Sequence, residues 1–159
     1  MLLLTWWLSF AKAFDKGPHE RLLLKLFEHG ILGKVLTWIR NWLSDRKQRV
    51  CISGEQSTWR PVWSGVPQGS NLGPVLFLIF INDIDCGIVN WILKFADDTK
   101  VFANITDDKS RELLQQDLNT LFEWSQNWHM EFNTQKCKVT RIGRSNPGYT
   151  YMMNGLVLE

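Results

Sequence analysis

The chain has 159 residues, of which 45% are hydrophobic and 21% are charged, and its formal net charge is +2. This composition excludes an intrinsically disordered chain and suits one globular domain of ordinary size. The net charge by itself is too small to argue for binding to nucleic acid. The three cysteines are odd in number and widely spaced, which fits neither a disulfide framework nor a zinc site. This pattern predicts a reducing intracellular setting, nuclear or cytoplasmic. We separately expect no membrane among the partners.

The first third of the chain predicts one strand and two helices. Residues 2–10 are dominated by bulky apolar side chains and predict a buried strand. Residues 11–13 imitate a signal peptidase site, but a basic region before the apolar stretch is missing, so secretion is the weaker alternative. Pro18 suits the first turn of a helix that ends at Gly30, and a second helix follows Gly33.

The middle of the chain predicts a hairpin, a loop and a buried helix. Residues 48–53 and 58–63 favour strands, and residues 54–57 are expected to join them as a hairpin. Residues 64–71 contain two glycines and one proline and predict a loop. The apolar run 72–82 that follows predicts a buried helix with Pro74 in its first turn, and it is too short to cross a bilayer.

Two adjacent carboxylates, Asp97 and Asp98, lie between apolar runs at residues 91–96 and 99–103. The pattern predicts a β-hairpin with both acids in its tight turn. Two anions held side by side favour a bound cation, and Mg²⁺ takes one or two carboxylates together with water and substrate phosphates. A solvated acidic turn is the alternative interpretation, because acidic turns are common.

The last third predicts a long helix that begins at Asp107 or Asp108 and ends near Trp128. Its polar face is expected to contain Asp107, Glu112, Asp117 and Glu123. Short strands are expected at residues 131–132 and 138–142, a turn at 146–148, and a further strand within 149–153. This order predicts an α+β fold with helices on one face of an antiparallel sheet and the acidic tip on the other.

Several motifs together resemble one family, the reverse transcriptases of non-LTR (LINE-type, jockey-like) retrotransposons. The matching segments cover nearly the whole chain in the family's order. They are Phe10-Ala11-Lys12-Ala13-Phe14-Asp15-Lys16, Gly65-Val66-Pro67-Gln68-Gly69-Ser70, Leu72-Gly73-Pro74, Phe95-Ala96-Asp97-Asp98, Trp128-His129-Met130 and Phe132-Asn133-Thr134-Gln135-Lys136-Cys137-Lys138. The resemblance implies a palm-like antiparallel sheet with helices on one face, partial fingers and no thumb, with residues 1–159 as one domain fragment.

The resemblance also implies roles for particular residues in an RNA-directed DNA polymerase. Asp97 and Asp98 would be the catalytic pair that holds two Mg²⁺ ions, and Lys136 would protonate the pyrophosphate, although a surface lysine is an equal alternative. Phe14 would lie under the sugar of the incoming dNTP, with a core residue as the alternative, and Gln68 and Gly69 would contact the nucleotide. An RNA template and a DNA primer would be the partners.

Two groups of basic residues could face the phosphates of nucleic acid, with ordinary solvated surfaces as the alternative. The candidates are Arg46, Lys47, Arg49 and Arg60 in the first group, and Lys138, with Lys136, Arg141 and Arg144 nearby, in the second.

One departure from the family pattern concerns the metal site. Ser9 occupies the position of the family's third metal-binding aspartate, and a neutral hydroxyl is a poor ligand for Mg²⁺. Asp15 lies six residues further on and is not expected to replace it. We therefore expect a weak or inactive polymerase. The alternatives are a non-catalytic nucleic-acid-binding remnant and a translated relic without a selected role.

Overall fold

The computed structural model describes residues 2–143 and 148–158. Among these residues, 2–13, 81–143 and 148–158 belong to one compact unit and 14–80 form a second. Arg144 lies outside the described residues, and so do residues 146 and 147 of the turn predicted at 146–148.

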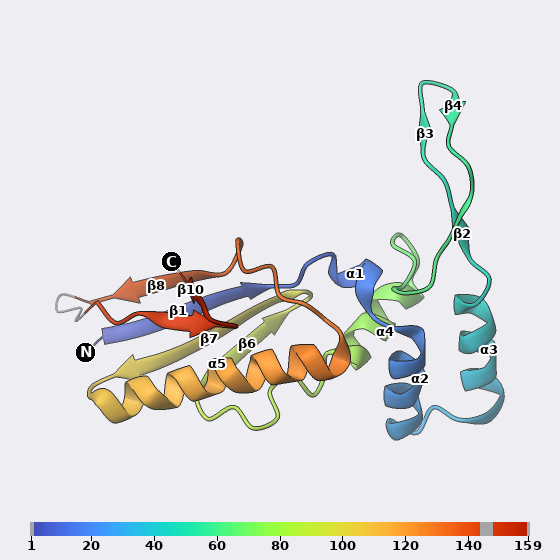
Figure 1. Cartoon of the computed structure of the whole chain (residues 1–159). Helices are drawn as coiled ribbons and strands as arrows, with labels where there is room; N and C mark the ends of the chain where they lie inside the picture. The colour runs from blue at the N-terminus through green and yellow to red at the C-terminus, as the bar shows by residue number, and fades with distance from the viewer. Residues whose placement is uncertain (1, 144–147, 159) are drawn as a thin grey trace. The chain divides into compact units, whose positions relative to one another are not determined.

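The first unit is built on a four-stranded antiparallel sheet with the strand order β6-β7-β1-β8 (Figure 1). Its strands are β1 (Leu2–Ser9), β6 (Trp91–Phe95), β7 (Asp98–Ile105) and β8 (Lys138–Ile142). Strand β1 pairs with β7 on one side and with β8 on the other. The predicted antiparallel sheet is confirmed, and it brings the amino-terminal strand beside the acidic hairpin.

Helix α5 (Asp108–Trp128) packs along β7 on one face of this sheet. Alternate residues of β7 and β1 are buried on that face, as the two-residue period of a strand requires. They are Thr99, Val101, Ala103 and Ile105 in β7, and Leu4, Trp6 and Leu8 in β1. The predicted buried strand is confirmed on the face toward α5, whereas Trp7 points to the other face and is 42% exposed.

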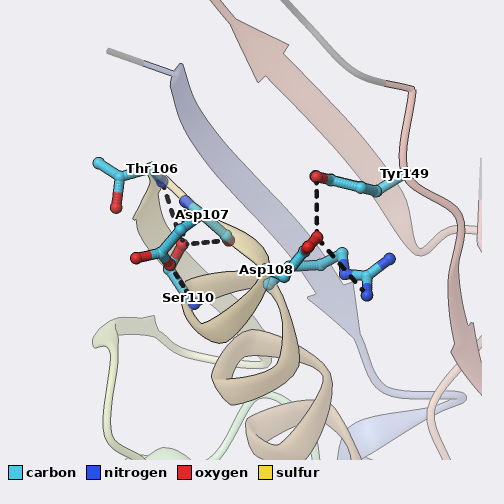
Figure 2. A network of polar contacts seen from close by, with 6 residues as sticks. Thr106, Asp107, Asp108, Ser110 and Tyr149 are labelled. Carbon is cyan, nitrogen blue, oxygen red and sulfur yellow. Dashed lines mark hydrogen bonds and ion pairs between the residues drawn. The ribbon is translucent and has the colours of Figure 1, made fainter.

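Helix α5 begins with a capping box, which confirms the predicted start of this helix. The Asp107 carboxylate accepts a hydrogen bond of 2.8 Å from the Ser110 backbone N–H, and the Ser110 hydroxyl accepts one from the Asp107 N–H (Figure 2). These bonds satisfy amides that a helix end otherwise leaves unpaired, and they lower the pKa of Asp107. Asp108 accepts a bond from the hydroxyl of Tyr149, which is the main reason that the pKa of Tyr149 is raised (Figure 2).

Asp117 was predicted on the polar face of this helix, and that prediction was wrong. Its side chain is 1% exposed and lies beneath the loop that precedes β6. The carboxylate accepts hydrogen bonds from the backbone N–H groups of Val89 and Asn90, both 2.9 Å, and from the Asn90 side-chain amide at 2.8 Å. Helical periodicity placed Asp117 among polar residues but could not detect the loop that covers it.

The end of the described chain is a hairpin of β9 (Tyr151–Met153) and β10 (Leu156–Leu158). Only its first strand was predicted. The turn is Asn154-Gly155, and both residues have positive φ, which is the signature of a tight hairpin turn that the sequence already carried. Gln115 of α5 fixes the edge of β9 by bonding both the N–H and the carbonyl of Met152.

The second unit contains α1 (Ala13–Lys16), α2 (His19–Glu28), α3 (Gly33–Leu43) and α4 (Leu72–Phe80). Helix α2 packs against both α3 and α4, so the predicted helices of this region are confirmed. Their shared core is apolar and consists of Leu22, Leu23, Leu26, Ile39, Leu43, Leu76, Phe77 and Phe80. No helix within the described part of the chain is long and apolar enough to cross a membrane.

A long two-stranded ribbon extends from α3 in this unit (Figure 1). At its base β2 (Lys47–Gln48) pairs with β5 (Arg60–Pro61), and at its tip β3 (Cys51–Ile52) pairs with β4 (Glu55–Gln56). The hairpin is confirmed, but its turn is Ser53-Gly54 and not residues 54–57. Both turn residues have positive φ, which the glycine tolerates and which makes the shorter turn possible.

Candidate functional site

The candidate site lies where β1 ends beside the beginning of β7. Ser9, the last residue of β1, is the cross-strand partner of Asp98, the first residue of β7. Asp98 is in turn the partner of Phe95 at the end of β6. Asp97 is in the turn between β6 and β7. The fold therefore gathers two half-buried carboxylates and one hydroxyl at the same end of the sheet.

The turn that presents the acids differs from the predicted one. Its two loop residues are Ala96 and Asp97, whereas Asp98 is already paired in β7. Ala96 has a φ of 51°, in the left-handed region that usually requires glycine at the first position of such a turn. The two carboxylates therefore have different supports, because Asp98 is fixed by a strand and Asp97 by a strained turn.

A segment that follows α5 closes the other side of Ser9. The Asn133 N–H donates a 2.8 Å hydrogen bond to the Ser9 carbonyl, and the Phe10 and Phe132 rings stack at 4.7 Å. Phe132 forms a single bridge with Phe10, so the predicted strand at 131–132 is reduced to that bridge. Burial raises the pKa of the Cys137 thiol, and a hydrogen bond with the Ser9 backbone opposes this. Ser9 is thus fixed from both sides.

The open face of the sheet continues from this site with aromatic and basic side chains. Lys100 lies over the Trp7 ring, with its Nζ 3.9 Å from the ring centroid. On the other side of Trp7 its cross-strand partner is Lys138, a predicted nucleic-acid-binding residue that is exposed. Lys100 was not among the predicted binding residues, although the two-residue period of a strand places it on the same face as Asp98. Lys136, also exposed, lies in the turn before β8.

The residues present fit one hard cation better than two. Mg²⁺ takes one or two carboxylates together with water and phosphate ligands, so Asp97 and Asp98 suit one ion, whereas a hydroxyl at position 9 adds no charge. Within residues 2–143 and 148–158, no group of three His, Cys, Asp or Glu side chains is placed to hold a metal ion. The chemistry of this donor set therefore lacks the third anion that would bridge a pair of ions.

In the second unit, the loop at residues 64–70 is bonded to the segment at residues 14–17. Gly65 N–H donates to the Gly17 carbonyl at 2.8 Å, Val66 N–H donates to the Phe14 carbonyl at 2.7 Å, and the Ser64 hydroxyl donates to the Asp15 carbonyl at 2.6 Å. A Cβ at Gly65 would overlap the Phe14 carbonyl and the Asp15 Cα. Gly65 is therefore required for this close approach of two backbones.

The predicted nucleotide-binding residues of this unit remain accessible around the anchored loop. Gln68 and Gly69 are exposed, and nothing lies within 4 Å of the position of a Cβ at Gly69. Phe14 is half-buried, and its ring stacks on Phe77 at 4.7 Å. Ser70 orders the end of the loop, because its hydroxyl donates to the Pro67 carbonyl and accepts from the Gly73 N–H at the start of α4.

The first group of basic residues divides into one partly buried and three exposed side chains. Arg46 donates a 3.1 Å hydrogen bond to the Gly65 carbonyl, which also has His19 Nε2 at 2.8 Å. Burial lowers the pKa of Arg46, and the charge of Asp15 opposes this. Lys47, Arg49 and Arg60 are exposed on the ribbon. Arg46 therefore supports the loop, whatever else it contacts.

Comparisons with known proteins agree on one family. The family model described as reverse transcriptase (RNA-dependent DNA polymerase) matches residues 6–152. The chain is 30% identical to the RNA-directed DNA polymerase from mobile element jockey of Drosophila melanogaster and 31% identical to that of Drosophila funebris. Each alignment covers 96% of this chain but 18% of the relative, so the chain spans under a fifth of their length.

Solved structures with a similar fold include fungal telomerases. Apo telomerase from Candida tropicalis, truncated from its C-terminal domain, gives a TM-score of 0.65 at 14% identity, with 98% of this chain and 34% of that chain covered. Telomerase from Candida albicans in complex with a fragment of telomeric RNA gives 0.64 at 12% identity, with 98% and 29% covered. At these identities the likeness shows a shared fold alone.

Proposed function

Because the chain belongs to the reverse transcriptase (RNA-dependent DNA polymerase) family, we propose that it forms the palm part of a site for RNA-templated DNA synthesis. The jockey-like resemblance expected from its motifs is confirmed by the relatives in Drosophila. The observation that supports the proposal is the pairing of Ser9 with Asp98 beside Asp97, which brings together at one end of a sheet the three positions to which the motif resemblance assigns metal binding.

In the proposed reaction, Asp97 and Asp98 would hold Mg²⁺ against the phosphates of an incoming dNTP. The bound ion would lower the pKa of the primer 3′-hydroxyl and neutralise charge on the phosphates. Lys136 would donate a proton to the departing pyrophosphate. Gln68 and Gly69 would position the nucleotide, and the Phe14 ring would reject a 2′-hydroxyl. Support for these roles comes from motif order and from accessibility, since Lys136, Gln68 and Gly69 are exposed and Asp97, Asp98 and Phe14 are half-buried.

We further propose that synthesis by this chain is weak because of Ser9. A third carboxylate at this position would contribute a full negative charge next to Asp98, and the serine hydroxyl contributes none. Removing a single oxyanion-hole donor in other enzymes lowers the rate by roughly 10²–10³, and a missing charged ligand should cost at least as much. The proposal therefore assigns the defect to one position rather than to the fold.

The test is primer extension on an RNA template with dNTPs and Mg²⁺. We expect Ser9→Asp to increase extension by roughly 10²-fold or more over the unmodified chain. Adding Asp97→Asn to Ser9→Asp should abolish that gain, whereas Glu112→Gln, an exposed change on α5, should preserve it. Extension by the Ser9→Asp chain that survives Asp97→Asn would show that Asp97 is not a catalytic acid.

A second candidate function is binding of nucleic acid without synthesis. It is favoured by the exposure of Lys47, Arg49, Arg60 and Lys138 together with the missing charge at position 9. It predicts salt-sensitive binding of oligonucleotides and no extension by the unmodified chain or by Ser9→Asp. Recovery of extension in Ser9→Asp would favour the first function.

A further inference from the structure

The ribbon formed by residues 47–61, which we call the exposed ribbon, has no protein covering it within its unit. Every residue from Lys47 to Pro61 is exposed, including Val50 at 60%, Ile52 at 69% and Trp59 at 56%. A two-stranded hairpin is at best marginally stable in water by itself. Its exposed apolar and aromatic side chains are therefore accessible to a partner molecule.

A β-bulge lies halfway along the exposed ribbon. Gln48 pairs with Arg60 and Cys51 pairs with Gln56, so Arg49 and Val50 stand opposite the three residues 57–59. The Val50 carbonyl still accepts from the Ser57 N–H at 2.9 Å, which places the extra residue at positions 58–59. Bulges of this kind re-aim side chains and increase local twist.

At this bulge an arginine and a tryptophan form a stacked pair. The Arg49 guanidinium carbon lies 4.5 Å from the centre of the Trp59 ring. Arg49 is an exposed residue, and a guanidinium can pair with an anion while it stacks on a ring. An exposed indole beside a cation combines the two features that bind a base and its phosphate.

The charge of the exposed ribbon selects the partner. It carries Lys47, Arg49 and Arg60 against the single carboxylate of Glu55, and its remaining residues are neutral. This excess of positive charge fits a polyanion. A paired duplex keeps its bases stacked inside, so an indole gains nothing from it unless the duplex opens. Unpaired bases can stack on Trp59 while their phosphates meet the three cations.

We propose that the exposed ribbon is a docking site for single-stranded nucleic acid, with Trp59 as the base-stacking residue and Lys47, Arg49 and Arg60 as phosphate contacts. The inference rests on the proposed function in one respect only, namely that the partner is a nucleic acid. It requires no catalytic step, so the ribbon can bind even if Asp97 and Asp98 prove inert. An unpaired stretch of template is the substrate class that this chemistry fits.

The experiment is a fluorescence anisotropy titration of the full chain with a fluorescein-labelled single-stranded oligonucleotide of about 12 nucleotides. We expect Trp59→Ala to weaken binding roughly ten-fold. The matched control is Trp38→Ala on α3, because Trp38 is also 56% exposed, and this change should leave the Kd unchanged. The titration contains no dNTPs or divalent ions, so its result does not depend on synthesis at Asp97 and Asp98, which separates this inference from the catalytic proposal.

The salt dependence of binding tests the phosphate contacts. Replacing Lys47, Arg49 and Arg60 together with glutamine should reduce the slope of log Kd against log salt by roughly 2, about 0.7 for each cation. Lys34→Gln on α3, an exposed lysine of the same unit, should reduce neither the slope nor the affinity.

Three outcomes would overturn the inference. A matched duplex that competes as well as the single strand, with no effect of Trp59→Ala, would make the ribbon a duplex-backbone site. Equal weakening by Trp38→Ala would remove the specific role of Trp59. Self-association of the chain that Trp59→Ala abolishes in sedimentation, without loss of oligonucleotide binding, would assign the ribbon to a contact between copies.

Discussion

Ser9 and Asp98 stand directly opposite each other in the antiparallel pair of β1 and β7. Directly opposed residues in such a pair have Cβ atoms roughly 4.5–5.5 Å apart. A side chain at position 9 therefore lies within reach of the Asp98 carboxylate, and Ser9 itself is 7% exposed. The residue at this position decides how much negative charge the site holds.

The first prediction concerns metal binding measured through stability. In the absence of divalent ions, Ser9→Asp should lower Tm, because like charges on opposed strands destabilise a sheet by roughly 0.2–1 kcal/mol. Adding Mg²⁺ should raise the Tm of Ser9→Asp clearly more than that of the unmodified chain, because a ligand that binds the folded state stabilises it. Thermal unfolding with and without Mg²⁺ measures both effects.

The control for this prediction is Ser9→Asn, which has nearly the size of the aspartate but no charge. Its Tm should respond to Mg²⁺ no more than that of the unmodified chain, which retains the same two carboxylates. If Ser9→Asn and Ser9→Asp respond equally to the ion, position 9 does not belong to a cation site.

The second prediction compares two glycines of the loop at residues 64–70. Both have positive φ, 75° at Gly65 and 81° at Gly69, so alanine is strained at either position by roughly 1–2 kcal/mol. Gly65→Ala must also push apart Phe14 and Asp15, whereas a Cβ at Gly69 meets nothing. Urea unfolding should therefore show a clearly larger loss of stability for Gly65→Ala. Equal losses would mean that the loop moves freely from residues 14–17.

The sequence predicted the elements whose signals are local. The capping residue Asp107, the helix after Gly33 and the hairpin around Asp97 all follow from propensity and pattern within a few residues. The motif order also led to the correct family, and the register of β1 with β7 placed Ser9 beside the acids as the family resemblance required.

The features that the sequence could not give depend on contacts between distant segments. Asp117 is polar and lies on a helix, yet its carboxylate is buried and accepts three hydrogen bonds from residues 89–90. Ala96 adopts a positive φ that its residue type disfavours, so propensity placed the turn one residue too late. The hydrogen bond from partly buried Arg46 to the Gly65 carbonyl likewise could not be predicted from the clustering of charged residues.

The third prediction concerns the buried carboxylate of Asp117. Asp117→Ala leaves the amides of Val89 and Asn90 without their acceptor, which should lower the free energy of unfolding by about 2–3 kcal/mol. Asp117→Asn retains one acceptor oxygen and should cost less. Glu123→Ala, an exposed change on the same helix, is the matched control and should stay within about 0.5 kcal/mol of the unmodified chain. Chemical denaturation measures all three, and similar losses for Asp117→Ala and Glu123→Ala would contradict the burial of Asp117.

The last prediction concerns acid stability and the start of α5. The hydrogen bonds from Ser110 favour the charged form of Asp107 and lower its pKa in the folded chain. The unfolded chain then binds a proton more readily than the folded one. The cap's contribution to stability is therefore complete above the ordinary aspartate pKa, and it is lost as the pH falls through the lowered pKa of the folded state.

Asp107→Asn separates the titration from the cap itself. Asparagine caps a helix about as well as aspartate does, but its side chain does not titrate in this range. The stability difference between the unmodified chain and Asp107→Asn should be constant near neutral pH and should shift against the unmodified chain as the pH falls below about 4. Urea midpoints over a pH series measure this difference, with Glu112→Gln as the control for loss of an exposed charge. Parallel curves for the unmodified chain and Asp107→Asn throughout the acid range would show that the Ser110 contacts do not favour the charged carboxylate.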